Sequence, residues 1–226
     1  MSMHGKLSVV ATPIGNLEDI TLRALRILKE VAYILCEDTR VTGKLLAHYG
    51  IHTKMKRYDA HASERTHAVI LDDLKEGKHI ALVSDAGTPG VSDPGVFLVA
   101  RAREAGACID AIPGASALTA AFSISGITGN HFAFLGFVPH KKGRETFFKS
   151  LSTYALPVLF YESPHRIMKT LDALVAHLST SARVMVAREL TKMHEEMVAG
   201  SPDEVRQYFV AHSDHVRGEF VVLVIP

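Results

Sequence analysis

The chain has 226 residues, of which 47% are hydrophobic and 22% are charged, and its formal net charge is +1. This length is enough for one large domain or two modest ones, and the composition is that of an ordinary globular protein. The balanced charge excludes a uniformly basic nucleic-acid-binding protein but still allows a local basic patch.

Three short apolar strands in the first half run directly into turns of Gly, Pro and small polar residues. The strands cover residues 7–11, 80–83 and 108–112, and the turns cover residues 12–16, 84–90 and 113–116. In open α/β sheets, ligands bind outside the carboxyl ends of the strands, and small turn residues let backbone N–H groups approach them. The three turns therefore predict one composite small-molecule site. The alternative is that Gly and Pro only punctuate loops.

Helical patterns separate these strands. Asp19 is a plausible N-cap before leucines at helical spacing, and a second helix follows the strand 32–36 and closes before Gly50. A third helix covers 62–76. Asp93-Pro94 is expected to open a fourth helix that runs to Ala105. This alternation favours a largely parallel sheet with helices on both faces.

No Asp, Glu, Lys or Arg occurs between Asp110 and Lys141, but Pro113 and several glycines interrupt this stretch. A transmembrane helix needs about 20 predominantly apolar residues, so no membrane span is expected here. The stretch instead predicts a buried helix over about 115–125, followed by a linker at 125–130.

Beyond the linker, strands and helices no longer alternate one by one. Strands are expected at 131–137, 157–161, 182–187, 195–199 and 218–225. Helices are expected over 143–151, from Ser163-Pro164 onward, and after a capping box at Ser201. Three strands with a single intervening helix indicate a mixed or antiparallel sheet. We therefore predict two α/β domains, 1–127 and 128–226, with the ligand in the cleft between them.

Cys36 and Cys108 each lie in an apolar strand-like run, and both are expected to be buried, reduced thiols of a cytosolic protein. Residues 1–6 lack the apolar core of a secretory signal. These features predict a cytoplasmic location.

Several common catalytic motifs are missing from the sequence. The run His194-Glu195-Glu196-Met197-Val198 ends in Val rather than the second His of a zinc protease, and no other histidines have clear metal-site spacing, so no metal is expected. There is also no phosphate-binding loop, no dinucleotide fingerprint and no nucleophile elbow. The site is therefore expected to bind a molecule that carries its own reactivity.

Four longer motifs carry a resemblance to a known family. They are T-P-I-G-N-L-E-D-I-T-x-R-A at 12–24, E-D-T-R at 37–40, S-D-A-G-T-P-x-x-S-D-P-G at 84–95 and P-G-A-S-A at 113–117. This pattern resembles the tetrapyrrole methylase superfamily and, within it, the bacterial 16S ribosomal RNA (cytidine-2′-O)-methyltransferases. The runs at 160–166 and 188–192 fit the same subfamily, and the resemblance covers essentially the whole chain.

The resemblance implies two α/β domains that hold S-adenosylmethionine between them. It implies methyl transfer to the ribose 2′-OH of a cytidine in the decoding region of 16S ribosomal RNA, within the small ribosomal subunit, and a homodimer. The alternative substrate is a tetrapyrrole precursor, and a third possibility is a cofactor-binding assembly or regulatory protein without turnover. Pro13 and Asn16 replace two positions of the Gly-rich first turn found in the small-molecule branch, which argues against the tetrapyrrole alternative.

The resemblance also assigns cofactor contacts. By motif, the cofactor-binding residues are Pro13, Gly15, Asp85, Ala86, Gly87, Val91, Ser116, Ala117, Tyr161 and Ala187. Tyr161 and Ala187 are expected to border the adenine. For Asp85, the alternative to a cofactor contact is the cap of an Asx turn.

A ribose hydroxyl is a poor nucleophile until it loses its proton, so a general base would help the reaction. Asp38, Glu162 and Glu189 are candidates because each follows a strand, although ion pairs within the same motifs are an equally good explanation for them. Candidate RNA contacts are Arg40, Lys44, Lys141, Lys142 and Arg144, for which solvent-exposed charge is the alternative.

Overall fold

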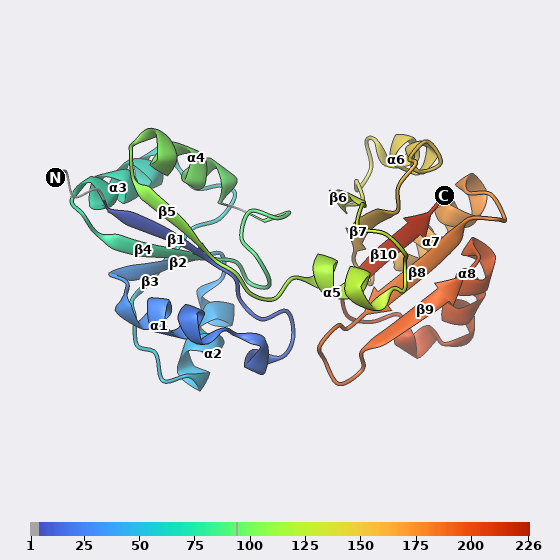
Figure 1. Cartoon of the computed structure of the whole chain (residues 1–226), viewed down its shortest axis with the longest axis horizontal. Coiled ribbons are helices and arrows are strands. Elements are labelled where there is room, and N and C mark those ends of the chain that lie inside the picture. Colours follow the sequence, from blue (N-terminus) through green and yellow to red (C-terminus); the bar gives the residue numbers. More distant parts are fainter. Residues whose placement is uncertain (1–4, 94) are drawn as a thin grey trace. The chain divides into compact units, whose positions relative to one another are not determined.

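The computed structural model describes residues 5–93 and 95–226 (Figure 1). Its contacts divide the chain into two compact units, with Ser116 the last residue of the first and Ala117 the first of the second. The boundary expected from the sequence lies at 127/128, so the two divisions differ in where they place the segment 117–127. Each unit has its own sheet and is described by itself.

The first unit contains a five-stranded sheet in which every neighbouring pair is parallel. Its strands are β1 (Lys6–Val10), β2 (Tyr33–Cys36), β3 (Met55–Arg57), β4 (His79–Val83) and β5 (Cys108–Ile112). Their order is β3-β2-β4-β1-β5. The predicted parallel sheet is confirmed, whereas β3 was not predicted because its three residues show no apolar pattern.

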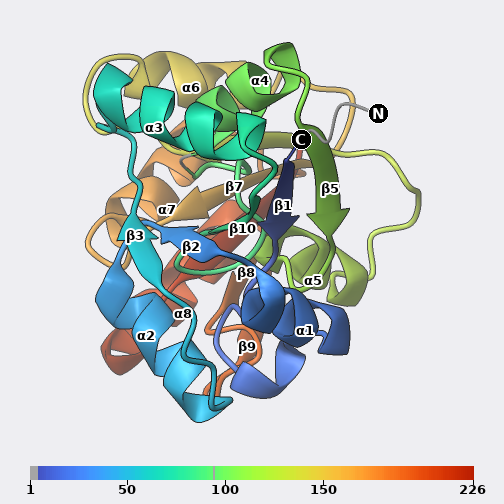
Figure 2. The same ribbon diagram turned by 90° about the vertical axis from the view of Figure 1, so that its left-hand side faces the viewer.

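Helices cover both faces of this sheet (Figures 1 and 2). The helices α1 (Leu22–Glu30) and α2 (Thr39–His48) pack on one face through apolar side chains that include Leu28 and Leu46. The helices α3 (Glu64–Lys75) and α4 (Val96–Glu104) pack on the other. Because β1 and β4 are neighbours whose following helices lie on opposite faces, the sheet has its topological switch point between them.

Two of the predicted helix starts in this unit are wrong. The N-cap of α1 is Thr21, whose hydroxyl accepts from the Ala24 amide at 3.1 Å, while Asp19 lies in a short 3-10 turn, η1 (Leu17–Asp19). The N-cap of α4 is Gly95 rather than Asp93, and Pro94 lies outside the described residues. A Cβ at Gly95 would come within 2.7 Å of Leu82, so no larger residue fits there without movement.

The second unit contains a mixed sheet. Its strands are β6 (Ala133–Phe137), β7 (Val158–Glu162), β8 (Arg183–Arg188), β9 (Glu196–Gly200) and β10 (Phe220–Ile225). Their order is β6-β7-β10-β8-β9, and the pair β6–β7 is parallel while the other three pairs are antiparallel. This confirms the predicted mixed sheet.

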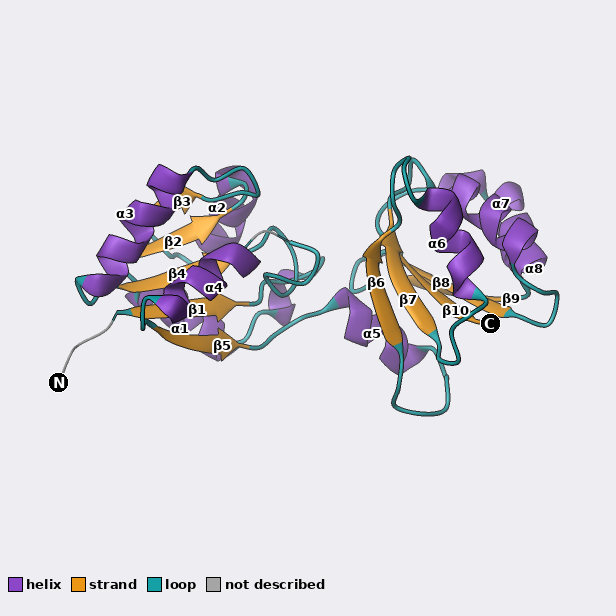
Figure 3. Ribbon diagram, turned by 90° about the horizontal axis from the view of Figure 1, so that it is seen from above, coloured by secondary structure: helices purple, strands orange, loops and turns teal. Residues whose placement is uncertain are grey.

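The helices α6 (Arg144–Leu151), α7 (Ile167–His177) and α8 (Pro202–Ala211) cover one face of this sheet (Figure 3). The predicted capping box of α8 is present, since the Ser201 hydroxyl and the Glu204 carboxylate each accept from the other's backbone amide. The helix α7 starts later than predicted because a turn in which two amides bond to the Ser163 carbonyl precedes Ile167.

The opposite face of this sheet carries α5 (Ala117–Ile124) (Figure 3). The prediction of a buried helix here is wrong, because Ala121 is its one buried side chain in the described part and Ile124 is 51% exposed. The small alanines and serines of this helix bury little area. No helix among the described residues is long and apolar enough to cross a membrane.

The cysteine prediction holds for one residue of two. Cys36 is buried in β2, whereas Cys108 is exposed at the start of the edge strand β5. An edge strand lacks a neighbour on one side, which explains the exposure.

Candidate functional site

The three predicted turns meet at the carboxyl edge of the first sheet. The amide and carbonyl groups of Thr12 and Gly87 bond reciprocally at 2.9 and 3.1 Å, and the Thr12 hydroxyl donates to the Ser84 carbonyl at 3.1 Å. The third turn lies against the end of β1, since a Cβ at Gly114 would be 3.1 Å from the Ala11 Cβ. The turns that follow β1, β4 and β5 therefore form one continuous surface.

Gly87 is required by this arrangement. Its φ of +77° lies in the left-handed region that favours glycine, and the residue is buried beneath the bridge to Thr12. A Cβ there would contact Ile14 at 3.4 Å. The backbone of this turn is consequently fixed in a shape that a side chain would strain.

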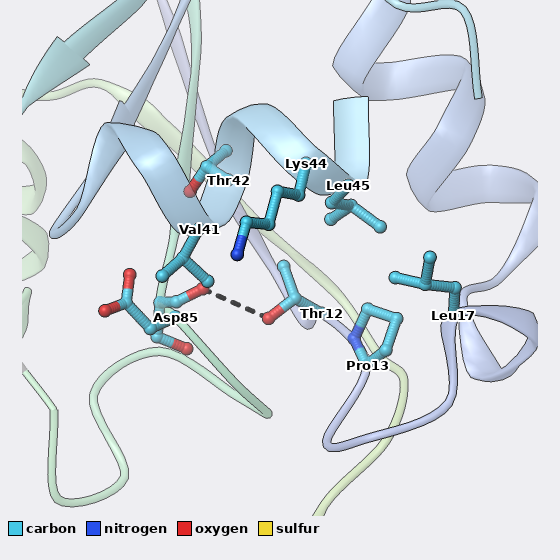
Figure 4. A pocket seen from close by; sticks show the side chains of 9 residues that line it. Thr12, Pro13, Leu17, Val41, Thr42, Lys44, Leu45 and Asp85 are labelled. Atoms are coloured by element: carbon cyan, nitrogen blue, oxygen red, sulfur yellow. Dashed lines mark hydrogen bonds between the residues drawn. The ribbon is translucent and has the colours of Figure 1, made fainter. Parts of the chain in front are cut away.

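A pocket of about 180 Å³ opens beside these turns, at the switch point between β1 and β4 (Figure 4). Its walls come from the turn after β1, the helix α2 and the turn after β4. The lining residues are Thr12, Pro13, Leu17, Val41, Thr42, Lys44, Leu45, Ser84 and Asp85. Three residues predicted to belong to the site, Pro13, Asp85 and Lys44, are thus brought together here.

Most other residues predicted to bind the cofactor flank this pocket or lie in the second unit. Gly15 and Ala86 are exposed beside it, Val91 is 37% exposed, and Ser116 follows the third turn. Ala117 begins α5. These positions are consistent with the predicted contacts and do not test them.

Tyr161 and Ala187 lie on one face of the second sheet. Both pair with Val221 of the central strand β10, one from each side, so their side chains point the same way. The Tyr161 ring also packs against Phe134 and Phe137, with centroids 4.9 and 5.3 Å apart. Their expected contact with the adenine stays a prediction.

Asp38, the first candidate base, is bound to Arg40. Its carboxylate accepts from the Arg40 amide at 2.8 Å and pairs with the guanidinium at 2.6 Å, and it caps α2. The hydrogen bonds from the Arg40 side chain and backbone lower the pKa of Asp38 to about 2. Such a carboxylate is a weak proton acceptor, which favours a structural role.

Glu162 is enclosed in the second unit, with 1% of its surface exposed. Arg166 pairs with it at 2.7 Å and Arg144 at 3.4 Å, while Thr170 donates a hydrogen bond at 2.6 Å. The Ser163 amide donates to the same carboxylate at 2.8 Å. A carboxylate held in this way serves the fold of the second unit, and its catalytic role remains only a prediction.

Glu189, the third candidate, lies in a tight loop with a φ of +49°. Its carboxylate accepts from Lys192 at 2.8 Å and from the Glu219 amide at 3.1 Å. Burial raises the pKa of Glu189, but these hydrogen bonds outweigh it and the net pKa is lowered. The carboxylate therefore ties the loop to the chain just before β10.

The candidate RNA contacts differ in accessibility. Lys141 and Lys142 are exposed in the loop before α6, and Arg40 is exposed on α2. Arg144 instead turns inward, where it donates to Thr170 at 2.8 Å and lies over the Phe148 ring. This geometry favours a structural role for Arg144.

Sequence reasoning missed two acidic residues beside the pocket, Glu37 and Asp93. Burial raises the pKa of Asp93 to about 6, helped by the charges of Glu37 and Asp85 and opposed by a hydrogen bond with Ser84. Burial and the charge of Asp85 likewise raise the pKa of Glu37. Both residues stand in the quoted motifs, but the pattern of Asp93-Pro94 indicated a helix cap instead.

These acids do not form a metal site. Among the described residues, no group of three or more His, Cys, Asp or Glu side chains could hold a metal ion. The Asp85 carboxylate instead accepts from the Asp38 amide at 3.1 Å, which links the turn after β4 to the start of α2.

Comparison with known proteins identifies the family. The model of the tetrapyrrole (corrin/porphyrin) methylases matches residues 6–206. The chain belongs to this family. The resemblance seen in the sequence motifs is therefore confirmed.

Curated relatives cover nearly the whole chain. A ribosomal RNA small subunit methyltransferase I from Neisseria meningitidis is 45% identical over 223 residues, which is 98% of this chain and 76% of the relative. A protein of the same name from Thermotoga maritima is 45% identical over 205 residues, covering 91% and 92% of the two chains.

Solved structures share the fold. A cobalt precorrin-4 methyltransferase of cobalamin biosynthesis aligns over 99% of this chain and 96% of its own, with a TM-score of 0.70 and 17% identity. A uroporphyrin-III C-methyltransferase from Thermus thermophilus, complexed with S-adenosylhomocysteine, aligns over 97% of each chain with a TM-score of 0.66 and 19% identity. The predicted two-sheet α/β fold is confirmed.

Proposed function

We propose that the protein is an S-adenosylmethionine-dependent methyltransferase that methylates the ribose 2′-OH of a cytidine in the decoding region of 16S ribosomal RNA. The observation that carries this proposal is the 45% identity, over 98% of the chain, to a relative named for small-subunit ribosomal RNA methylation. The alternative of a tetrapyrrole precursor is supported by the description of the family and by structures at 17–19% identity, which share only the fold.

The residues at the carboxyl edge suit a cationic cofactor. Gly87 and Gly114 let the turns after β4 and β5 pack against Ile14 and Ala11, which fixes the shape of this edge. Glu37, Asp85 and Asp93 give this edge a negative potential that attracts a sulfonium. When bound, S-adenosylmethionine supplies an electrophilic methyl group, and the negative edge would orient its charged end.

A side chain of the protein must act as the general base that removes the proton from the ribose hydroxyl. Asp93 is the best candidate because it is partly buried beside the pocket residues Ser84 and Asp85 and has no guanidinium or ammonium partner among the described residues. A pKa of about 6 lets its carboxylate be ionised at neutral pH and still accept a proton readily. In this proposal Asp93 would accept the hydroxyl proton, and transfer of the methyl group from sulfur to the ribose oxygen would leave S-adenosylhomocysteine.

The test is methyl transfer from labelled S-adenosylmethionine to small ribosomal subunits from a strain that lacks this protein. Nuclease mapping and mass spectrometry would locate the label, and a 2′-O-methylcytidine in the decoding region is the expected product. Label on a base, on another ribose or on a tetrapyrrole precursor alone would contradict the proposal.

A further inference from the structure

The surface that lines the pocket of the first unit is mostly apolar. The side chains of Pro13, Leu17, Val41 and Leu45 form apolar walls, and the Thr12 hydroxyl lies at one side (Figure 4). Ligand pockets for whole cofactors or drugs usually enclose about 300–1,000 Å³. At about 180 Å³, this pocket suits a fragment the size of a nucleobase.

Lys44 supplies the positive charge at this pocket, and Asp85 is the other ionisable residue of its lining. It projects from α2, and its ammonium group points to the space beside Thr12 and Val41 (Figure 4). Nearby cations are neutralised, since Arg40 pairs with Asp38 at 2.6 Å and Arg57 pairs with Asp59 at 2.9 Å. Within the described part of the chain, Lys44 has no ion-pair partner.

This positive charge selects among ligands. A free ammonium repels the sulfonium of the cofactor and attracts a phosphate. A small pocket with apolar walls and a lysine at its edge therefore suits one nucleotide of a polynucleotide chain. The base would occupy the pocket, and a phosphate would lie near the lysine. Enzymes that act on a nucleotide within structured RNA or DNA commonly hold the extruded base between apolar side chains.

We propose that this pocket receives the nucleobase of the target nucleotide, turned out of the RNA, and that Lys44 holds a phosphate next to that nucleotide. The proposal rests on the function proposed above and names the part of the substrate that the pocket binds. In this proposal Val41 and Leu17 contact the base, and the turns after β4 and β5 bind the cofactor.

Two substitutions on exposed positions of α2 test the proposal without disturbing the core. Lys44→Ala removes the phosphate contact, and Val41→Glu places a carboxylate in the pocket, where it opposes both a phosphate and an apolar ring. Val41 is 40% exposed, so the charge can be carried without unfolding. The matched controls are Lys29→Ala on α1 and Val69→Glu on α3, both at exposed positions outside the pocket.

The measurements are steady-state methylation of unmethylated small subunits, binding to those subunits, and calorimetric affinity for S-adenosylhomocysteine. We expect Lys44→Ala to raise the KM for small subunits about tenfold and to lower the salt dependence of binding by about one unit of slope. Val41→Glu should reduce kcat/KM for small subunits about 100-fold. The two pocket variants and the two control variants should all bind S-adenosylhomocysteine with an affinity within about twofold of the wild type.

Two results would overturn the pocket assignment. One is wild-type KM for small subunits in both variants. The other is a tenfold loss of S-adenosylhomocysteine affinity in the pocket variants but not in the controls, which would give the pocket to the cofactor. A wild-type protein that methylates no small subunit, but whose binding to them is weakened by Val41→Glu, would contradict the proposed reaction and still support the pocket.

Discussion

Glu162 in the second unit is buried and Asp93 in the first is partly buried, and their electrostatic surroundings are opposite. Two arginines, a hydroxyl and an amide surround Glu162. Asp93 faces Glu37 and Asp85, with Ser84 as its hydrogen-bond partner. A carboxylate with full compensation holds a fold together, whereas one among like charges is ready to exchange a proton.

The largest expected effect comes from breaking the compensated group. Glu162→Ala leaves Arg144 and Arg166 without their shared buried partner and should lower the free energy of unfolding by about 3–5 kcal/mol. Urea denaturation measures this. Glu145→Ala, which removes an exposed pair with Lys149, is the control and should stay within about 0.5 kcal/mol. Equal losses in both variants would contradict the structural role assigned to Glu162.

Asp93→Asn tests the uncompensated carboxyl group. The amide keeps the shape but cannot accept the ribose proton, so kcat for methyl transfer should fall about 100-fold. Affinity for S-adenosylhomocysteine, measured by calorimetry, should stay within about threefold. Asp38→Asn is the comparison, with a smaller effect on kcat. A kcat that falls for Asp38→Asn and not for Asp93→Asn would reverse the assignment.

The pH profile sharpens the same comparison. Asp93 accepts a proton only when it is ionised, and its pKa is raised to about 6. The kcat/KM for methyl transfer should therefore rise with pH and level off above pH 6. At about pH 5, kcat/KM should be roughly tenfold below its plateau. The substitution Asp93→Asn should flatten this limb. A wild-type profile that is flat between pH 5 and 8 would exclude Asp93 as the base.

The smallest expected effect concerns the turn after β4. Gly87→Ala places a Cβ at a φ of +77° and against Ile14, which should cost about 1–2 kcal/mol of stability. Thermal unfolding would detect it. Gly50→Ala shares a positive φ of +61° but has no atom within 4 Å of the new Cβ, so the excess loss at Gly87 measures the contact with Ile14.

Much of the fold could be predicted from the sequence because its signals are local. Apolar runs that end in Gly-Pro turns locate β1, β4 and β5, and the capping box locates the start of α8. The strand β3 was missed because its place beside β2 depends on tertiary pairing. The burial of α5 was overestimated because composition does not show how much of a helix the sheet covers.

The site was less predictable for a related reason. Motifs indicate which carboxylates lie near the carboxyl ends of strands, but they do not show which cation each one meets. The partner of Asp38 lies two residues away, while Arg144 reaches Glu162 across 18 residues of sequence. Asp93 gains its environment from Asp85, which lies in the same connection between β4 and α4, and from Glu37, which follows β2. Only the folded chain reveals these pairings.

The central position of β10 has a consequence for how the chain folds. This strand joins β7 to β8, so until it has been synthesised the second sheet exists only as the separate pairs β6–β7 and β8–β9. The exposed edges of β7 and β8 are open to wrong pairing during that interval. Completion of the second unit therefore waits for its final strand, whereas every strand of the first sheet has already been made by residue 112.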